Sequence, residues 1–547
     1  MDNALDACEE AGIVPEIKVE ILQIADNRFR VEVTDNGPGI VRAQIPKIFA
    51  KLLYGSKFHR LRMSRGQQGI GISAAGMYGQ LTTGTSTRIL SRTGGKQGHH
   101  IEVQIDTRRN MPAILKDEEV DWRPEFPVPG ARKADAVQTY PHGTSVAIEM
   151  EAAYVRGRLS VDEYLKQCAV VNPHLQLHYR IVLKKGAPEE DNGQAKKSAP
   201  AKPEAELPKG KKAEEDADTT DQQKEAVAPQ IATVQTDVAW TTFQRVNKEL
   251  PDPPREIKPH PHGVELGLLM QMLKDSSSRT IRSALSEDFS RVSSAVAFQI
   301  CERAGLNPKA NPTRIAHQES EALFKAINDT KLMRPPTDCL SPIGEAQIVA
   351  GLKKEIQADF YTAVTRAPTV YRGNPFQIEA GIAYAKPDPN QEIGADEPVR
   401  MMRFANRVPL LHMAGACAIN KAIIAVDWKR YGLSQPKGSL PIGPMVVMVH
   451  MASVWVPFTS ESKEAIAHYP EIIREMTFCL QECGRQLSVY LRKRFRLMEF
   501  DRKRNYMALY IPHLALGLKN ILDLNDKQEK GIIANLNKML ERTHLDT

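Results

Sequence analysis

The sequence lacks the features that mark exported, metal-stapled or membrane-bound proteins. Its seven cysteines form no Cys-x-x-Cys pair, which excludes a disulfide framework and the usual zinc sites. No apolar run approaches the roughly 20 residues of a membrane-spanning helix, and the amino terminus has no basic segment followed by an apolar one. These absences predict a cytoplasmic protein, nucleoid-associated if it binds DNA, with no membrane partner.

The sequence also lacks a strong excess of either charge. Lys and Arg number 73 against 66 Asp and Glu, giving a net charge of +7 over 547 residues. Such a mild balance is compatible with a DNA partner through local patches, but it is equally compatible with an ordinary basic surface. Length and a 42% hydrophobic content predict three or four domains.

Large apolar residues nearly vanish between 184 and 232, which predicts a disordered linker after a first domain at 1–183. Before the linker, alternating residues predict a β-hairpin; after it, the pattern favours a helical module, then an α/β domain, then a long basic helix. The expected hairpin strands are 16–24 and 28–34, the module helices 263–274, 283–304 and 311–328, the α/β strands 445–450 and 454–457, the α/β helices 343–353 and 408–425, and the last helix 469–503.

The first glycine motif follows directly on an expected strand. It contains Asp35, Gly37 and Gly39, and glycines there let the backbone turn sharply and approach a ligand. A carboxylate at such a turn can accept the exocyclic amine of adenine. Taken alone, the motif is more often a plain turn, so it needs support from elsewhere in the chain.

Support comes from a second glycine-rich loop at 66–73, which leads into a helical segment. Closely spaced glycines before a helix expose backbone N–H groups and the positive helix end, and both attract phosphates. The spacing fits neither the P-loop nor the dinucleotide fingerprint. A third motif opens a later strand with His142, Gly143 and Thr144, and could place the Thr144 hydroxyl beside the Asp35 carboxylate.

These motifs occur in the order found in the GHKL ATPases, the group of gyrase, heat-shock chaperones, mismatch-repair ATPases and histidine kinases. Segments 51–59 and 64–75 resemble more specifically the B subunits of topoisomerase VI, which is a type IIB DNA topoisomerase. Segments 258–263, 289–293, 335–342 and 403–411 also resemble that family, so the likeness covers nearly everything except the linker.

The resemblance implies an α+β protein with a GHKL (Bergerat) ATPase sandwich, a helix-two-turns-helix module at 233–335, a ribosomal S5-like transducer domain at 336–490 and a C-terminal helical tail at 491–547. It implies ATP and Mg²⁺ as cofactors, with Asn3 as a magnesium ligand. The residues expected at ATP are Asn3, Asp35, Gly37, Gly39, Ser56, Lys57, Gly66, Gln67, Gln68, Gly69, Ile70, Gly71, Ile72, Ser73, Thr144 and Lys429.

The motif Trp-Lys-Arg-Tyr at 428–431 resembles the loop that carries the family's switch lysine, which makes Lys429 the expected catalytic lysine. A lysine at the γ-phosphate adds positive charge where negative charge develops during transfer. Without the resemblance, Lys429 would be taken for a solvated surface residue. The basic run 492–504 could follow a DNA backbone, but a wet helix face with the family's A subunit nearby is the favoured interpretation.

The resemblance also implies function and partners. Two B subunits would dimerise on ATP, capture double-stranded DNA, and drive cleavage by the topoisomerase VI A subunit in an A2B2 heterotetramer. The family's catalytic Glu stands four residues before the Asn of its first motif, which is two residues before Met1, so we expect a chain shortened at its amino terminus. A nucleotide-binding scaffold without turnover and another GHKL ATPase, such as a chaperone, stay open as alternatives.

Overall fold

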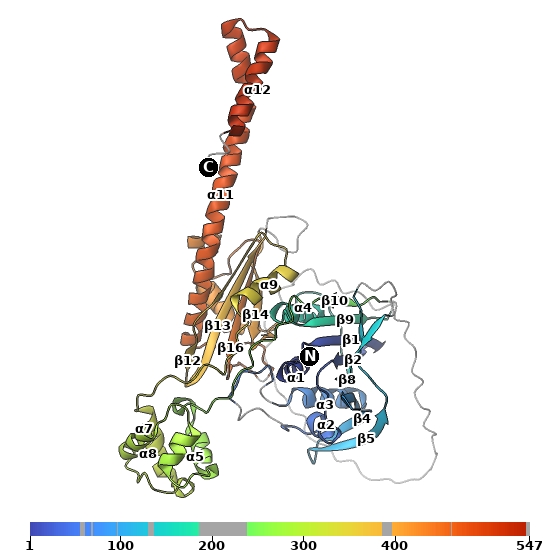
Figure 1. The fold of residues 1–547 in the computed structure, drawn as a ribbon, viewed down its shortest axis with the longest axis vertical. Coiled ribbons are helices and arrows are strands. Elements are labelled where there is room, and N and C mark those ends of the chain that lie inside the picture. Colours follow the sequence, from blue (N-terminus) through green and yellow to red (C-terminus); the bar gives the residue numbers. More distant parts are fainter. Residues whose placement is uncertain are drawn as a thin grey trace, which may run out of the picture.

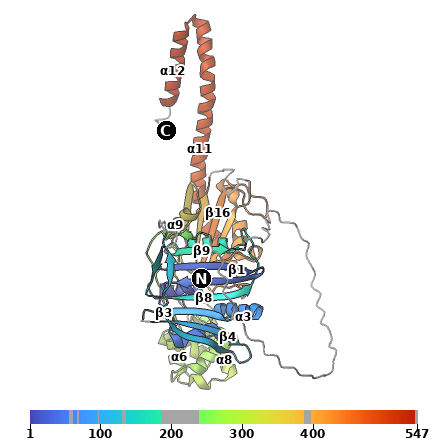
Figure 2. The same ribbon diagram turned by 90° about the vertical axis from the view of Figure 1, so that its right-hand side faces the viewer.

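The computed structural model describes residues 1–54, 61–66, 69–95, 97–129, 136–184, 238–385, 396–460 and 462–542. The chain builds a sheet-and-helix domain at its amino terminus, a small helical module, a second sheet-and-helix domain and a helical hairpin that projects from the body (Figures 1 and 2). The expected α+β class is therefore confirmed. Except for Lys184, the expected linker lies outside the described residues.

The amino-terminal domain is built on an eight-stranded sheet with the strand order β10-β9-β1-β2-β8-β3-β4-β5. The predicted hairpin is confirmed, because β1 (Glu16–Ala25) pairs antiparallel with β2 (Arg28–Asp35). The other strands of this sheet are β3 (Thr87–Thr93), β4 (Gly98–Asp106), β5 (Met111–Val120), β8 (His142–Glu151), β9 (Gln176–Val182) and β10 (Thr241–Phe243); β6 (Glu125–Pro127) pairs separately with β7 (Val137–Thr139).

Helices cover one face of this sheet, while the other face carries charged side chains. Ile17, Val19 and Ile21 alternate along β1 and are buried with Leu5 of the first helix. The opposite face bears ion pairs such as Arg30 with Glu149. Because side chains alternate between faces, Asp35 lies on the helix-covered side, like Phe29. The helices are α1 (Asp2–Glu10), η1 (Arg42–Gln44), α2 (Ile45–Ala50), α3 (Gly71–Thr83) and α4 (Val161–Val171).

The helical module packs around its own core, and one prediction for it is wrong. The expected single helix at 283–304 is two helices separated by a turn. Arg291 adopts a positive φ of 61°, and the Ser293 hydroxyl accepts a hydrogen bond from the Val296 amide, which starts a new helix. The module comprises η2 (Pro261–Gly263), α5 (Leu266–Asp275), α6 (Ile281–Asp288), α7 (Ser294–Arg303), η3 (Pro312–Arg314) and α8 (His317–Asn328).

The second domain has a sheet of order β11-β13-β16-β14-β15, with β12 beside β13. Two expected elements are wrong here. Segment 454–457 bends away because the Ser453 hydroxyl binds the Trp455 amide, and the first half of 408–425 is a strand and a 3-10 turn. The elements are α9 (Glu345–Glu355), β11 (Phe360–Thr365), β12 (Thr369–Tyr371), β13 (Asn374–Tyr384), β14 (Arg400–Ala405), β15 (Val408–Pro409), η4 (Ala414–Ala416), α10 (Ala418–Ala425), η5 (Trp428–Tyr431) and β16 (Met445–Ser453).

Both faces of this second sheet are covered. Val447 and Val449 of β16 pack with helices α10 and α11, whereas Val446 and Met448 pack with α9 and with Val170 of α4 from the first domain. Helix α9 lies so close to α4 that a Cβ on Gly351 would stand 2.0 Å from the Val170 carbonyl oxygen. The two domains therefore share an apolar contact.

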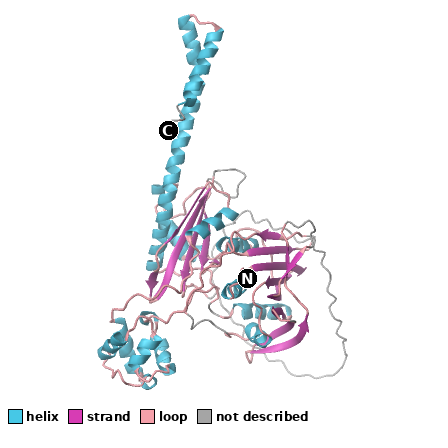
Figure 3. Cartoon of the chain, viewed as in Figure 1, coloured by secondary structure: helices cyan, strands magenta, loops and turns pink. Residues whose placement is uncertain are grey.

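The last predicted helix is confirmed and is longer than expected. Helix α11 (Pro470–Leu522) has 53 residues and includes Pro512, so the expected domain boundary after 490 falls inside one helix. Helix α12 (Asp526–Arg542) folds back along it, and Figure 3 shows the projection to be helical throughout. Within the described ranges, no helix combines the length and apolarity needed to cross a membrane.

Candidate nucleotide-binding site

Asp35 ends β2 inside the amino-terminal domain, where its carboxyl group is held by backbone amides. Its Oδ1 atom accepts hydrogen bonds from the amides of Gly37 at 2.9 Å and Thr144 at 3.2 Å. The side chain is 8% exposed, and burial raises the pKa of Asp35 to about 6. Thr144 was expected to meet Asp35 through its hydroxyl, but its backbone amide makes the contact. Oδ1 is thus occupied, which leaves Oδ2 for a ligand.

The two glycines after Asp35 are required by close approaches. A Cβ on Gly37 would lie 2.9 Å from Oδ1 of Asp35, and one on Gly39 would lie 2.1 Å from the carbonyl oxygen of Arg92. Gly39 also has a φ of +74°, which favours glycine. His142 closes the turn, since its Nδ1 lies 2.7 Å from the Gly37 carbonyl oxygen and must carry the proton. The sequence motif included His142 without giving it this role.

The second glycine loop runs into the amino-terminal end of α3. Gly69 has a φ of +66°, and α3 begins at Gly71, so the first amides of the helix face the loop without partners in the helix itself. Ser73 is buried and its hydroxyl donates to the Ile70 carbonyl, while Ile72 packs into the core. These residues can meet phosphates through the backbone. Four expected ATP residues, Ser56, Lys57, Gln67 and Gln68, lie outside the described ranges.

Helix α1 brings Asn3 to the start of this loop. A Cβ on Gly66 would lie 3.4 Å from Oδ1 of Asn3, so the exposed amide oxygen faces the glycine directly. At the other end of α1, the Sγ of Cys8 lies 3.6 Å from Oδ1 of Asn36, next to Gly37. One short helix therefore touches both glycine motifs.

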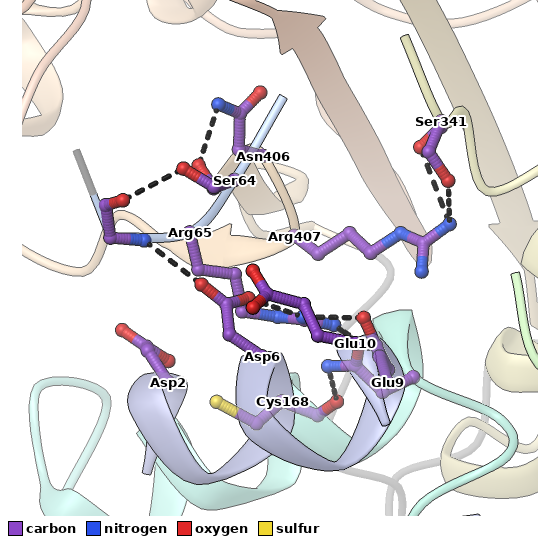
Figure 4. A network of polar contacts seen from close by, with 12 residues as sticks. Asp2, Asp6, Glu9, Glu10, Ser64, Arg65, Cys168, Ser341, Asn406 and Arg407 are labelled. Carbon is purple, nitrogen blue, oxygen red and sulfur yellow. Dashed lines mark hydrogen bonds and ion pairs between the residues drawn. The ribbon is translucent and has the colours of Figure 1, made fainter. Parts of the chain in front are cut away.

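Arg65 ties the loop to α1 through a buried ion network (Figure 4). Its Nη1 donates to Asp6 at 2.9 Å and to Glu9 at 2.7 Å, and its Nη2 donates to Glu9 at 2.7 Å and Asn172 at 2.6 Å. Although burial opposes it, the Arg65 guanidinium, with a hydrogen bond from His174, holds the pKa of Glu9 well below its usual range. Sequence reasoning missed these roles, because the partners lie far apart in the chain.

The lysine that reaches the loop is Lys463, not Lys429. Lys429 is exposed in η5, which packs against α11, and makes no contact with the glycine loops in the described structure. Lys463, in the second domain, donates from Nζ to the Arg65 carbonyl at 3.3 Å. Burial lowers its pKa, while Asp2 and Asp6 of α1 act in the opposite direction. The sequence offered only a Ser-rich loop, residues 459–463, as a signal for this position.

The described donors fit magnesium only as a nucleotide-bound ion. In the described residues no cluster of three or more His, Cys, Asp or Glu could hold a metal by itself. Asn3 nevertheless offers an exposed amide oxygen beside the glycine loop, and Mg²⁺ usually takes one or two protein oxygens and completes its shell with phosphates and water.

Two cavities lie near these elements. One, of about 240 Å³, opens at the seam between the domains beside Arg65, Asn406 and Arg407. The other, of about 460 Å³, lies between Tyr154 and Thr241 at the β9–β10 edge and includes none of the expected ATP residues. We therefore centre the candidate site on the glycine motifs and not on the larger cavity.

Comparison with known proteins agrees with this arrangement. Residues 1–109 match the profile of histidine kinase-, DNA gyrase B- and HSP90-like ATPases, and residues 335–503 match that of the transducer of the topoisomerase VI B subunit. The second domain is therefore called the transducer below.

Curated relatives extend the match over nearly the whole chain. The type 2 DNA topoisomerase 6 B subunit of Methanosarcina barkeri is 40% identical over 98% of this chain and 75% of its own length. Its counterpart in Methanococcoides burtonii is 40% identical over 100% of this chain and 76% of its own.

Among solved structures, the DNA gyrase B-subunit of Myxococcus xanthus covers 89% of this chain and 87% of its own with a TM-score of 0.33 and 11% identity, which carries no weight beside the sequence matches. The curated matches span both domains and the seam between them. The chain therefore belongs to the family of type 2 DNA topoisomerase 6 B subunits.

Proposed function

We propose that this chain is the ATP-driven clamp of a type IIB DNA topoisomerase. Two copies dimerise when each binds ATP with Mg²⁺, and together they enclose a segment of double-stranded DNA. Closure passes through the transducer to the enzyme's A subunit in an A2B2 assembly, where the A subunit cuts both strands. The observation that carries the proposal is the transducer lysine at the glycine loop of the ATP domain.

The adenine end of the nucleotide belongs at Asp35. Its Oδ1 is fixed by two amides, and Oδ2 accepts the exocyclic amine of adenine. Such a buried acceptor gives base specificity, because a ligand without the matching donor would leave the carboxylate unpaired.

The phosphate end belongs at the loop between Gly66 and the start of α3. Backbone amides and the positive end of α3 stabilise negative phosphate oxygens there. Asn3 is the residue that holds magnesium, which when bound offsets the phosphate charge. The Arg65 network keeps α1 and the loop together, so Asn3 stays beside Gly66.

Lys463 takes the role that the sequence pattern gave to Lys429. Its ammonium group lies one hydrogen bond from the loop, and it belongs to the domain that must respond to the nucleotide. The residue has a φ of +56°, a conformation that costs a non-glycine residue about 1 kcal/mol. We propose that Lys463 contacts the terminal phosphate of ATP and so distinguishes ATP from ADP.

The helical hairpin α11–α12 is the proposed docking element for the A subunit. Its distal part exposes large apolar side chains, which favours burial against a partner. They include Phe495, Leu497, Met498, Tyr506, Met507, Leu509, Leu514, Ile521, Leu522 and Met539. The basic run at 492–504 lies on the same helix, near the proposed interface.

Sedimentation analysis tests the clamp directly. We expect the chain to be monomeric alone and with ADP, and to dimerise with magnesium and a non-hydrolysable ATP analogue. Asp35→Asn is the matched control and should stay monomeric at the same nucleotide concentration. A parent chain that binds the analogue by calorimetry and stays monomeric would contradict the clamp, while absence of binding would contradict the ATP site itself.

Reconstitution tests the partners. Mixed with the A subunit, the chain should sediment as one complex, and truncation before residue 495 should abolish that complex without altering nucleotide affinity. A complex that survives this truncation would move the interface with the A subunit away from α11 and α12.

A further inference from the structure

A two-residue turn of the transducer meets the glycine loop of the ATP domain. Asn406 and Arg407 join β14 to β15 and have φ values of +48° and +64°. Asparagine adopts this left-handed conformation readily, whereas for arginine it is strained. Strain of this kind persists only where the surroundings fix the turn, and here they do so through both residues.

The Asn406 side chain bridges the two domains. Its Nδ2 donates to the Ser64 carbonyl at 3.0 Å in the ATP domain and to the Ser453 carbonyl at 2.9 Å at the end of β16. Its Oδ1 accepts from the Ser453 amide at 2.9 Å. Ser64 in turn donates from its hydroxyl to the Gly66 carbonyl at 2.7 Å. One amide group thus links the start of the glycine loop to the central strand of the transducer (Figure 4).

Arg407 continues the connection into the middle of the transducer sheet. Its amide donates to Nε2 of His450 at 3.0 Å, so the His450 proton is on Nδ1, which donates to Glu379 at 2.8 Å. Glu379 also accepts the amides of Ile343 and Gly344 at the start of α9. Arg407, His450 and Glu379 are all buried and hydrogen-bonded, so a shift at one end is passed on by contact.

The Arg407 guanidinium has no carboxylate hydrogen-bonded to it in the described structure. It donates to the carbonyls of Ser341 and Pro342, and burial lowers its pKa to about 10. Beside it lies the seam cavity of about 240 Å³, which Asp6 and Arg65 also line. The seam is therefore tight at the contact of α4 with α9 and open at the turn, so the turn has room to move.

We propose that Asn406 is a positioning residue that couples the glycine loop to the transducer. A nucleotide that draws the loop toward its phosphates displaces the Ser64 carbonyl, and Asn406 passes this displacement to Ser453 and the end of β16. This inference rests on the proposed function, because it needs a nucleotide at the loop. Coupling of two sites within one protein commonly amounts to about 5-fold to 150-fold in affinity.

Two substitutions isolate the Asn406 amide. Asn406→Asp keeps the size and tolerates the positive φ, but it replaces the donor to Ser64 by a second acceptor. Asn406→Gly keeps the backbone conformation and removes the side chain altogether. Asn110→Asp is the matched control, because Asn110 also has a positive φ of 50° and bonds to Leu52, but within the ATP domain alone.

The experiment is hydrogen exchange of the full chain with and without magnesium and a non-hydrolysable ATP analogue, at saturation fixed by calorimetry. In the parent and in Asn110→Asp we expect slower exchange, by about fivefold or more, both in the glycine loop and in β16. In either Asn406 variant we expect protection of the loop to stay and protection of β16 to fall below about twofold, with nucleotide affinity within about threefold of the parent.

Each other outcome decides the matter. Protection of β16 that persists in both Asn406 variants, or that is absent from a parent that binds nucleotide, overturns the coupling role. A parent that binds no nucleotide overturns the proposed function instead. If Asn406→Asp fails to fold, as judged by circular dichroism, Asn406→Gly decides alone, because glycine suits the turn.

Discussion

The two large sheets of this protein are covered differently, and the difference separates chemistry from mechanics. In the ATP domain, β1 alternates buried residues such as Ile17 with partly exposed ones such as Lys18, so only one face is packed. In the transducer, every residue of β16 is buried. A half-covered sheet leaves room for a ligand beside its helices, whereas a fully covered one moves as a rigid unit.

Charged residues follow the same division. In the sheet of the ATP domain, Glu32 pairs with Arg88 where both side chains keep contact with solvent. In the transducer, Glu379 pairs with His450 where neither side chain is exposed. The first kind of pair adjusts a surface, and the second fixes how strands and helices register.

The largest expected effect comes from breaking the buried pair. Glu379→Ala should lower the unfolding free energy of the transducer by about 3–5 kcal/mol, because His450 and two amides lose their acceptor. Glu32→Ala, its counterpart in the other sheet, should cost about 0–1 kcal/mol. Native-state hydrogen exchange at β13 and β3 measures both. Equal losses would erase the distinction between the sheets.

Next in size is the loss of the adenine acceptor. Asp35→Asn should weaken ATP binding by roughly tenfold to a hundredfold, since a charged hydrogen bond contributes about 1.5–3 kcal/mol. Calorimetry with ATP gives the affinity, and thermal unfolding shows whether the fold survives. An unchanged affinity would refute the adenine site, and the half-covered sheet would lose its assigned chemistry.

A smaller effect distinguishes the two transducer lysines. Lys463→Ala should reduce ATP affinity by about fivefold to tenfold and leave ADP affinity nearly unchanged, because only ATP carries the terminal phosphate. Lys429→Ala should alter neither, since Lys429 is exposed beside α11. If Lys429→Ala were the variant that lost selectivity, the sequence-based choice would be restored.

The smallest effect is that of pH, which acts on the two regions through opposite shifts. The pKa of Asp35 is raised to about 6, so between pH 7.5 and 5.5 its carboxylate fraction and ATP affinity should fall by roughly fourfold. Asp35→Asn should bind weakly at both pH values and show no such dependence. A flat profile in the parent would mean that Asp35 does not contact the base.

In the transducer, burial lowers the pKa of His450 below its unfolded value. The unfolded chain then takes up the proton first, so stability present above about pH 6.5 is lost as the pH falls. Hydrogen exchange at β16 should accelerate over this range. Protection that increased on acidification would contradict a neutral His450.

Local patterns predicted the parts of the site that lie close together in the chain. The Asp35 turn needs glycines because backbone atoms approach within 2.1 Å of the space a side chain would fill, and such a need is visible in sequence. The β1–β2 hairpin follows from alternation alone. The helix boundaries near Arg291 were missed, because a positive φ at an arginine leaves no signature in composition.

The sequence by itself determined the family, the order of the domains and the residues of the two glycine motifs, since each depends on short-range patterns. Only the tertiary structure decided which lysine meets the loop, because Lys463 and Arg65 are 398 positions apart and meet only when the domains pack. The same holds for Asn406 and the Arg65 network. Contacts across a domain seam are fixed by the packing of whole sheets and helices, which no local pattern encodes.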